Sequence, residues 1–426
     1  MKKTLKKIIS SEGLQKSAFL VGVSLLATSI AAIALVIFSR LLGPEKFGEF
    51  SVGVAIIFIL LKLTDLGSTQ ALLRFVPTKK TQEEKGTFFF QLAFWRGKLA
   101  LGVIFIAIVI GIISLKLGYS IRPEILFGAI LLTLIMVAYE HLYFFLLSMG
   151  LIAQAALMNG AQAITKLLAV LVLTLIQLST SMSSFVLYSL APLLGVVSGI
   201  IYLPKWLIKP TQNNSKLSPA VTQFISHSAA GVIAMGIIEN ISVVQLRGMM
   251  TAYDTGIFGG VSKISLFIVL GGSYLSQVLF PRVTQYTQPK TQQKYLIKAL
   301  LFIGLIGVCF LAYWPFNQFV LKLTLGSDYL PGAQSLLILM AAAMVYVATI
   351  PLSALFYAGD KYWYFSLSGI LQIIIVIFGN LIAVPRWGLL GAAGVILLAR
   401  GVVLILTGVL VIHDVFLYNN TLKGVS

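Results

Sequence analysis

The sequence predicts an all-α, polytopic membrane protein with about twelve transmembrane helices in two six-helix lobes around a central cavity. First, 58% of the 426 residues are hydrophobic and 10% are charged, with a mean hydropathy of +0.98. A soluble protein of this length carries far more charge. Second, apolar runs of roughly 20 residues recur, and each is long enough to span a bilayer. Third, one polar connection divides these runs into six and six.

The apolar periodicity places the spans along the whole chain, and the connections between them are short. The polar connection at residues 204–222 is rich in Pro, Asn, Ser and Lys, which is typical of a linker. It separates a predicted N-terminal lobe, residues 1–203, from a C-terminal lobe, residues 223–426. The predicted spans are 17–39, 50–73, 90–117, 125–147, 154–177, 183–203, 223–246, 256–280, 297–320, 332–357, 363–383 and 389–412.

The basic residues indicate how these spans are oriented. The loops and ends on the N-terminal side of the membrane hold 20 Lys and Arg, and those on the other side hold 7. Because positive loops stay inside, both termini are expected in the cytoplasm. The net charge of +18 is thereby explained by topology, without a nucleic-acid partner.

The sequence lacks the residues that several classes of function require. The sequence has no G-x-x-x-x-G-K-[ST] motif for ATP and no H-E-x-x-H motif, and its three His are scattered. Its only cysteine, Cys309, excludes a disulfide within the chain and a cysteine-based metal site. We therefore expect a transporter that is neither an enzyme nor an ATPase, without a metal or other cofactor, and driven by an ion, potential or substrate gradient.

Two short similarities indicate that the lobes are repeats of each other. The tetrapeptides FGEF (47–50) and TGIF (255–258) share G-x-F at an offset of 208 residues. Gly150 and Gly359, in corresponding loops, are 209 residues apart. Six spans per repeat return the chain to the same side, so the repeat is expected to be parallel.

Polar residues form a stripe on the predicted span 50–73. Lys62, Asp65, Ser51 and Thr69 lie on one helical face, and Lys62 and Asp65 at i, i+3 are close enough to touch. The span 154–177 has a similar face with Lys166, Asn159 and Gln162. Such residues usually face a bundle interior or a water-filled cavity.

Basic residues near the span ends are assigned to the flanking loops. The other charged residues within the spans are four basic and three acidic. This surplus predicts a cationic cavity for an anion, with Asn and Gln suited to a hydroxyl-rich ligand. The alternative for each residue is an ion pair that locks two helices together. The candidate substrate-binding residues are Lys62, Lys166, Arg400, Lys263, Asn159 and Gln162, and the candidates for H⁺ or Na⁺ coupling or for structural ion pairs are Asp65, Glu140 and Glu239.

Three segments contain motifs of a known family. FGEF and TDLGSTQALLRF, within residues 39–75, resemble F-G-x-[FY] and D-L-G-x-x-x-[AS]-[LI]-x-R-[FY]. Two further segments are LGSDYLPGAQSLLILMAA (325–342) and 359–395, which contains PRWGLLGAA. With these segments the sequence resembles the bacterial polysaccharide transporters, the O-antigen-type flippases of the multidrug/oligosaccharidyl-lipid/polysaccharide (MOP) superfamily, in which the last two segments correspond to the ninth-to-twelfth-helix region. The family-motif residues are Arg40, Gly48, Asp65, Gly67 and Arg74.

The resemblance implies alternating access of an undecaprenyl-diphosphate-linked oligosaccharide from the inner to the outer leaflet. It also implies membrane lipid as a partner, with a glycan polymerase and a chain-length regulator as candidate protein partners. Two alternatives stay open: a lipid II or drug exporter of the same superfamily, and a membrane glycan polymerase or ligase. The short outer loops disfavour the polymerase or ligase, and the basic interior disfavours an exporter of cationic drugs.

Overall fold

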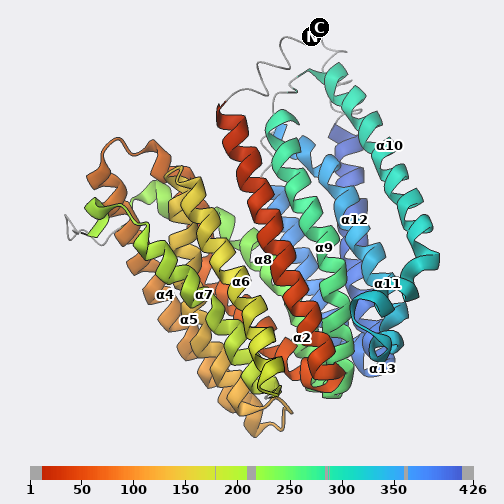
Figure 1. Ribbon diagram of the computed structural model, residues 1–426. Helices are drawn as coiled ribbons and strands as arrows, with labels where there is room; N and C mark the ends of the chain where they lie inside the picture. Colours follow the sequence, from red (N-terminus) through yellow and green to blue (C-terminus); the bar gives the residue numbers. More distant parts are fainter. Residues whose placement is uncertain are drawn as a thin grey trace. The chain divides into compact units, whose positions relative to one another are not determined.

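The computed structural model describes residues 12–177, 179–208, 217–283, 286, 288–358 and 363–414, and all regular structure in these ranges is helical (Figure 1). Ten helices within them are long and apolar enough to cross a membrane. The prediction of a polytopic α-helical membrane protein is therefore confirmed. The described residues do not include most of the two chain ends, residues 209–216 of the predicted linker, or the loop with Gly359.

The first half of the chain contains the predicted spans one to six. Its elements are α2 (Glu12–Asp65), α3 (Ser68–Phe75), η1 (Val76–Thr78), α4 (Gln82–Lys116), α5 (Pro123–Ser148), α6 (Ile152–Leu175), α7 (Ser181–Ile201) and η2 (Lys205–Ile208).

The second half contains the predicted spans seven to twelve. Its elements are α8 (Pro219–Met249), α9 (Ala252–Val283), α10 (Pro289–Tyr313), η3 (Trp314–Phe316), α11 (Asn317–Thr324), η4 (Ser327–Gly332), α12 (Ala333–Ala358) and α13 (Trp363–Ile412).

The two longest helices, α2 and α13, each contain a kink at a glycine. Gly43 has φ 67° and ψ 171°, and Gly388 has φ 52° and ψ −128°, which are conformations that only glycine adopts readily. Each kink falls in the gap between two predicted spans. The ten long helices are thus compatible with twelve crossings, and the count of twelve stays a prediction.

The predicted second span, 50–73, is wrong in its inner part. The helix α2 ends at Asp65, and the backbone then turns through two residues with positive φ, Leu66 at 45° and Gly67 at 96°. The short helix α3 follows the turn. The single polar stripe expected along this span therefore does not exist, because Thr69 lies beyond the break.

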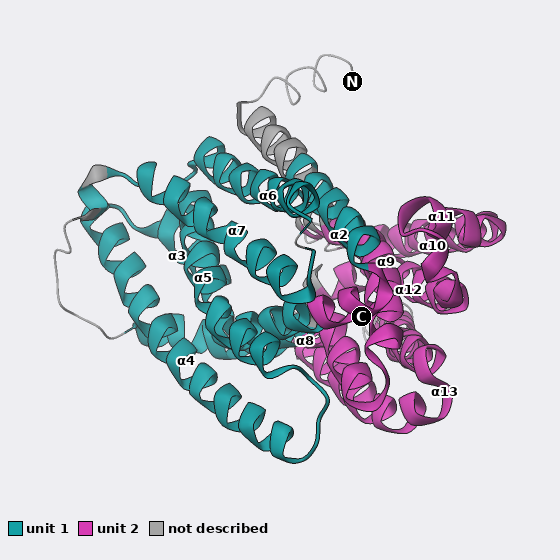
Figure 2. Ribbon diagram, turned by 60° about the horizontal axis from the view of Figure 1, so that its bottom comes forward, with its two compact units in different colours: residues 1–42, 52–236 teal, residues 43–51, 237–426 magenta. Residues whose placement is uncertain are grey.

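Contacts within the chain define two compact units (Figure 2). Unit 1 comprises residues 1–42 and 52–236, and unit 2 comprises residues 43–51 and 237–426. In unit 1, α5 contacts α4, α6 and α7, and in unit 2, α12 contacts α9, α10 and α13. The segment 43–51 packs with unit 2 although its sequence neighbours on both sides belong to unit 1.

Small residues let the helices of unit 1 approach each other closely. On α7, a methyl group at Gly195 would lie 2.6 Å from the Tyr139 ring, and one at Gly199 would lie 2.5 Å from Leu142 Cδ2. Lipid tails are as apolar as the side chains, so close packing rather than hydrophobic transfer holds such helices together. This packing fixes α5 and α6, the helices that carry Glu140 and Lys166.

Candidate functional site

Asp65 terminates one helix and starts the next. Its Oδ1 accepts hydrogen bonds from the Ser68 hydroxyl at 2.7 Å and the Thr69 backbone N–H at 2.9 Å, and its Oδ2 accepts one from the Thr69 hydroxyl at 2.9 Å. The first N–H groups of a helix lack intrahelical partners, and a carboxylate placed there stabilises it. The family motif at Asp65 and Gly67 is therefore a helix break with its own cap.

At the turn, Gly67 is constrained by the space around it as well as by its backbone angle. A methyl group at Gly67 would lie 2.1 Å from the Ser228 hydroxyl oxygen of α8. Gly67 thus meets two requirements, a positive φ and a close approach to a neighbouring helix. Alanine would satisfy neither of them.

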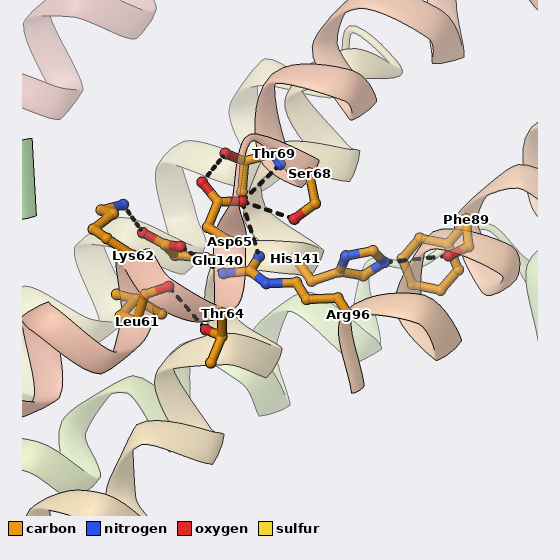
Figure 3. A network of polar contacts seen from close by, with 10 residues as sticks. All are labelled: Leu61, Lys62, Thr64, Asp65, Ser68, Thr69, Phe89, Arg96, Glu140 and His141. Carbon is orange, nitrogen blue, oxygen red and sulfur yellow. Dashed lines mark hydrogen bonds and ion pairs between the residues drawn. The ribbon is translucent and has the colours of Figure 1, made fainter. Parts of the chain in front are cut away.

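Arg96 of α4 joins the two carboxylates of this region (Figure 3). Its Nη2 donates to Glu140 Oε2 at 2.8 Å, and its Nη1 lies 4.0 Å from Asp65 Oδ1. The Arg96 side chain is 1% exposed. A buried charge of this kind persists only when it is paired, so Arg96, Asp65 and Glu140 form one structural unit.

Lys62 belongs to the same network, although its partner is not the expected one. Its Nζ donates to Glu140 Oε1 at 2.7 Å, so the predicted contact with Asp65 at i, i+3 is replaced by a contact between helices (Figure 3). The carbon stem of Lys62 fits against Gly236 of α8, where a methyl group would lie 2.4 Å from Lys62 Cγ. Lys62 and Arg96 balance Asp65 and Glu140 in formal charge.

Arg96 was not predicted as a site residue, because it lies near the start of the predicted span 90–117 and was assigned with other basic residues to the preceding inner loop. A signal for its burial was present in the spacing. Phe88, Leu92, Ala100 and Ile104 are buried on α4, and Arg96 continues this series of i, i+4 positions. A charged residue in register with a narrow apolar stripe faces the interior. Without Arg96, the inner loops and ends still contain more Lys and Arg than the outer ones, so the predicted orientation is unchanged.

Lys166 of α6 differs from the other buried cations of unit 1. Its side chain is buried, and it has no carboxylate or hydrogen-bond partner in the described part of the chain. Its Nζ lies 4.4 Å from the centroid of the Tyr188 ring on α7. A ring face stabilises a cation only partly, so most of the cost of burying this ammonium stays uncompensated.

Asn159 and Gln162, two turns and one turn before Lys166 respectively, are half-buried on the same helix. Asn159 Oδ1 accepts a long hydrogen bond, 3.4 Å, from the Tyr139 hydroxyl. The Gln162 Oε1 atom is buried without a hydrogen-bond partner in the described residues. The polar face predicted for this helix therefore exists, and part of its hydrogen-bonding capacity is unused.

In unit 2, Arg400 of α13 is buried and pairs with Glu239 of α8. Its guanidinium also lies 5.5 Å from the centroid of the Tyr346 ring on α12. Lys263 of α9 is half-buried and also interacts electrostatically with Glu239. The sequence predicted that Arg400 binds the substrate, whereas in the structure its charge is paired with the Glu239 carboxylate of the same unit.

Three further polar contacts of unit 2 were not predicted. Arg247 and Glu49 form a buried ion pair at 3.3 Å, although both had been assigned to loops at the outer membrane edge. Asn380 of α13 donates to the Ser242 hydroxyl at 2.9 Å and to Gln245 Oε1 at 2.8 Å on α8. These contacts join helices that are far apart in sequence, which no local pattern reveals.

The remaining family-motif residues lie at ends of helical segments. Arg74 is exposed near the end of α3, and its guanidinium stacks over the Phe224 ring at 4.7 Å from the centroid. Arg40 is exposed just before the kink of α2. Gly48 lies after that kink, in the segment that packs with unit 2.

Comparison with known sequences identifies the family. Residues 14–287, more than half of the chain, match the sequence profile of the family described as polysaccharide biosynthesis protein. The chain belongs to this family. A search among curated proteins gives no match.

Solved structures show which fold this family member has. A multidrug resistance MATE transporter of the MOP superfamily, inward-facing, is 13% identical with a TM-score of 0.72 over 93% of this chain and 96% of that one. The lipid II flippase MurJ, inward closed, is 13% identical with a TM-score of 0.69 over 92% and 86%. A MOP superfamily transporter from Pyrococcus furiosus, whose binding pocket is described as reversed in polarity, is 12% identical with a TM-score of 0.64 over 94% of each chain.

This member of the polysaccharide biosynthesis family is therefore a multi-pass membrane protein whose fold is similar to that of these MOP superfamily structures. Within the described residues, each of its three predicted coupling acids has a basic partner in its own unit: Asp65 with Arg96, Glu140 with Lys62 and Arg96, and Glu239 with Arg400. These contacts favour the structural alternative for the acids. They leave Lys166 as the basic site residue whose charge no carboxylate neutralises.

Proposed function

We propose that this protein flips an undecaprenyl-diphosphate-linked oligosaccharide from the cytoplasmic to the outer leaflet of the bacterial inner membrane. The family and the fold support a flippase of polysaccharide biosynthesis. The mechanism is alternating access, with both termini in the cytoplasm, as the distribution of Lys and Arg predicts. Substrate drives the cycle only to the extent that it binds the inward and outward states unequally.

The observation that carries this proposal is that Lys166 is buried without a carboxylate partner in the described residues. Since Lys62 and Arg400 are already paired, they cannot offer a full charge to a ligand without losing their partners. Lys166 can offer its full charge to a ligand, because no carboxylate of the described residues pairs with its ammonium. We therefore assign the diphosphate to Lys166, and the sugar hydroxyls to Asn159 and Gln162 on the same face.

The competing functions differ in what they require of the interior. An exporter of cationic drugs needs an unpaired acid, whereas Asp65, Glu140 and Glu239 are all paired within their units. A lipid II flippase shares the diphosphate, so Lys166 does not distinguish it from an oligosaccharide flippase. A polymerase or ligase would change the length of the glycan chain without requiring its translocation.

The test replaces Lys166 with Ala and with Arg and follows export of the glycan in cells at matched protein level. We expect Lys166→Ala to reduce export at least tenfold and Lys166→Arg to retain a substantial part of it, because the charge is kept. Normal export by Lys166→Ala at normal protein level would remove the assigned role.

The matched control is Lys98→Ala, which removes an exposed cation on α4 whose ammonium lies over the Phe94 ring. It should export as the wild type does. Supplying lipid II in a parallel assay distinguishes the two lipid-linked substrates, and measuring chain length in the same cells tests the polymerase alternative.

A further inference from the structure

A small cavity lies beside Lys166 and is lined by residues of unit 1. Lys166, Tyr188 and Ser189 form its polar wall, and apolar side chains of α2 and α5, among them Val54, Ile57 and Met136, form the rest. Its volume is about 20 Å³. This is room for about one water molecule or one monatomic ion.

The polar wall has two buried groups with unused hydrogen-bond donors. Lys166 is 5% exposed and Ser189 is 4% exposed. The Ser189 Oγ atom has no hydrogen-bond partner in the described residues, and the Lys166 ammonium has only the Tyr188 ring. Buried polar groups are normally satisfied, and a buried charge without a counter-charge is costly.

These groups specify the charge of a ligand that would fit. An ammonium and a hydroxyl both donate to an anion, and the apolar part of the wall offers nothing that a cation would coordinate. A phosphate, with four oxygens around phosphorus, is too large for a cavity with room for about one water molecule.

We propose that this cavity binds a monatomic inorganic anion, chloride in the cell, between the Lys166 ammonium and the Ser189 hydroxyl. The anion neutralises Lys166 in the described conformation. Chloride binding itself does not depend on which substrate is transported. Its displacement by a diphosphate when the cavity widens does rest on the proposed function.

The experiment measures the thermal unfolding of the full-length protein in lipid nanodiscs, with chloride exchanged for gluconate at constant ionic strength. For the wild type we expect a saturable rise in Tm of a few degrees with chloride, and a similar rise with bromide, because a ligand that binds only the folded state stabilises it. A wild-type Tm that is the same in chloride and gluconate would overturn the proposal.

Two variants localise the effect to this cavity. Lys166→Met should lose the chloride response and, in gluconate, be at least as stable as the wild type, because an uncompensated charge has been replaced by an apolar group of similar size. Ser189→Ala, which removes only a hydroxyl, should need several-fold more chloride. If either variant responds to chloride as the wild type does, the site is not here.

The matched control is Lys62→Met, which removes an interior cation of unit 1 that already has a carboxylate partner. Its stability is expected to fall while its chloride response remains. The two proposals also fail separately. A chloride response lost in Lys166→Met together with normal export by Lys166→Ala would support the anion site and reject the transport role.

Discussion

Gly48 and Gly256 face each other across a contact between the main chains of α2 and α9. A methyl group on Gly48 would lie 1.9 Å from the Ala252 carbonyl oxygen, and one on Gly256 would lie 1.7 Å from the Pro44 carbonyl oxygen. Gly48 and Gly256 are 208 residues apart, as are Pro44 and Ala252. The two G-x-F segments of the predicted repeat thus contact each other through equivalent atoms.

Replacement of either glycine by alanine should therefore prevent normal packing of the segment 43–51. The obstructing atoms are main-chain carbonyl oxygens of helices, which cannot rotate away as a side chain does. We expect Gly48→Ala to lower the free energy of unfolding by about 3 kcal/mol or more, the upper end for overpacked sites. Thermal unfolding of the purified protein measures this.

Gly97→Ala is the control for this substitution, since a methyl group there meets no atom within 4 Å. Alanine is the better helix former, so this variant should be as stable as the wild type or slightly more stable. Equal stability of Gly48→Ala and Gly97→Ala would contradict the close contact.

Arg96→Met should be among the most destabilising substitutions in unit 1. It leaves Asp65 without its cation and Glu140 with Lys62 alone. Breaking a buried pair in this way costs about 3–5 kcal/mol. Denaturant unfolding compares it with Lys98→Met, an exposed cation two residues away, which should change stability by less than about 0.5 kcal/mol. A small effect of Arg96→Met would show that the network is not structural.

Asp65→Asn should reduce the amount of folded protein without changing how transport is driven. The carboxylate is engaged by Ser68, Thr69 and Arg96, so its structural role accounts for its burial. Export measured with and without a proton or sodium gradient, at matched protein level, is expected to keep the wild-type gradient dependence. Loss of that dependence would assign Asp65 to ion coupling instead.

Arg400 and Glu239 should behave as one pair. Glu239→Gln leaves the buried Arg400 guanidinium without its counter-charge, and Arg400→Met leaves the carboxylate. Each single variant should lose about 3 kcal/mol or more, whereas Glu239→Gln with Arg400→Met should be more stable than the sum predicts. A double-mutant cycle by thermal unfolding measures the coupling, and additive losses would mean that the pair makes no net interaction.

The sequence by itself determined the class, the approximate positions of the helices and the family. Apolar runs report their length and polarity locally, so α5, α6 and α7 begin within a few residues of the predicted spans. The polar face of α6 was also predictable, because it depends only on the helical period. The end of α2 at Asp65 was not, since the motif letters at Asp65 and Gly67 were known but the backbone angles they adopt were not.

Only the tertiary structure decided which charges are free. Lys62, Arg96, Arg400 and Lys166 are all basic residues among apolar neighbours, and nothing in their local sequence separates them. Lys62 and Arg96 meet Glu140 from two other helices and Arg400 meets Glu239 of α8, while Lys166 meets only the ring of Tyr188. Whether a buried cation is paired depends on side chains from helices distant in sequence, and these are brought together by packing.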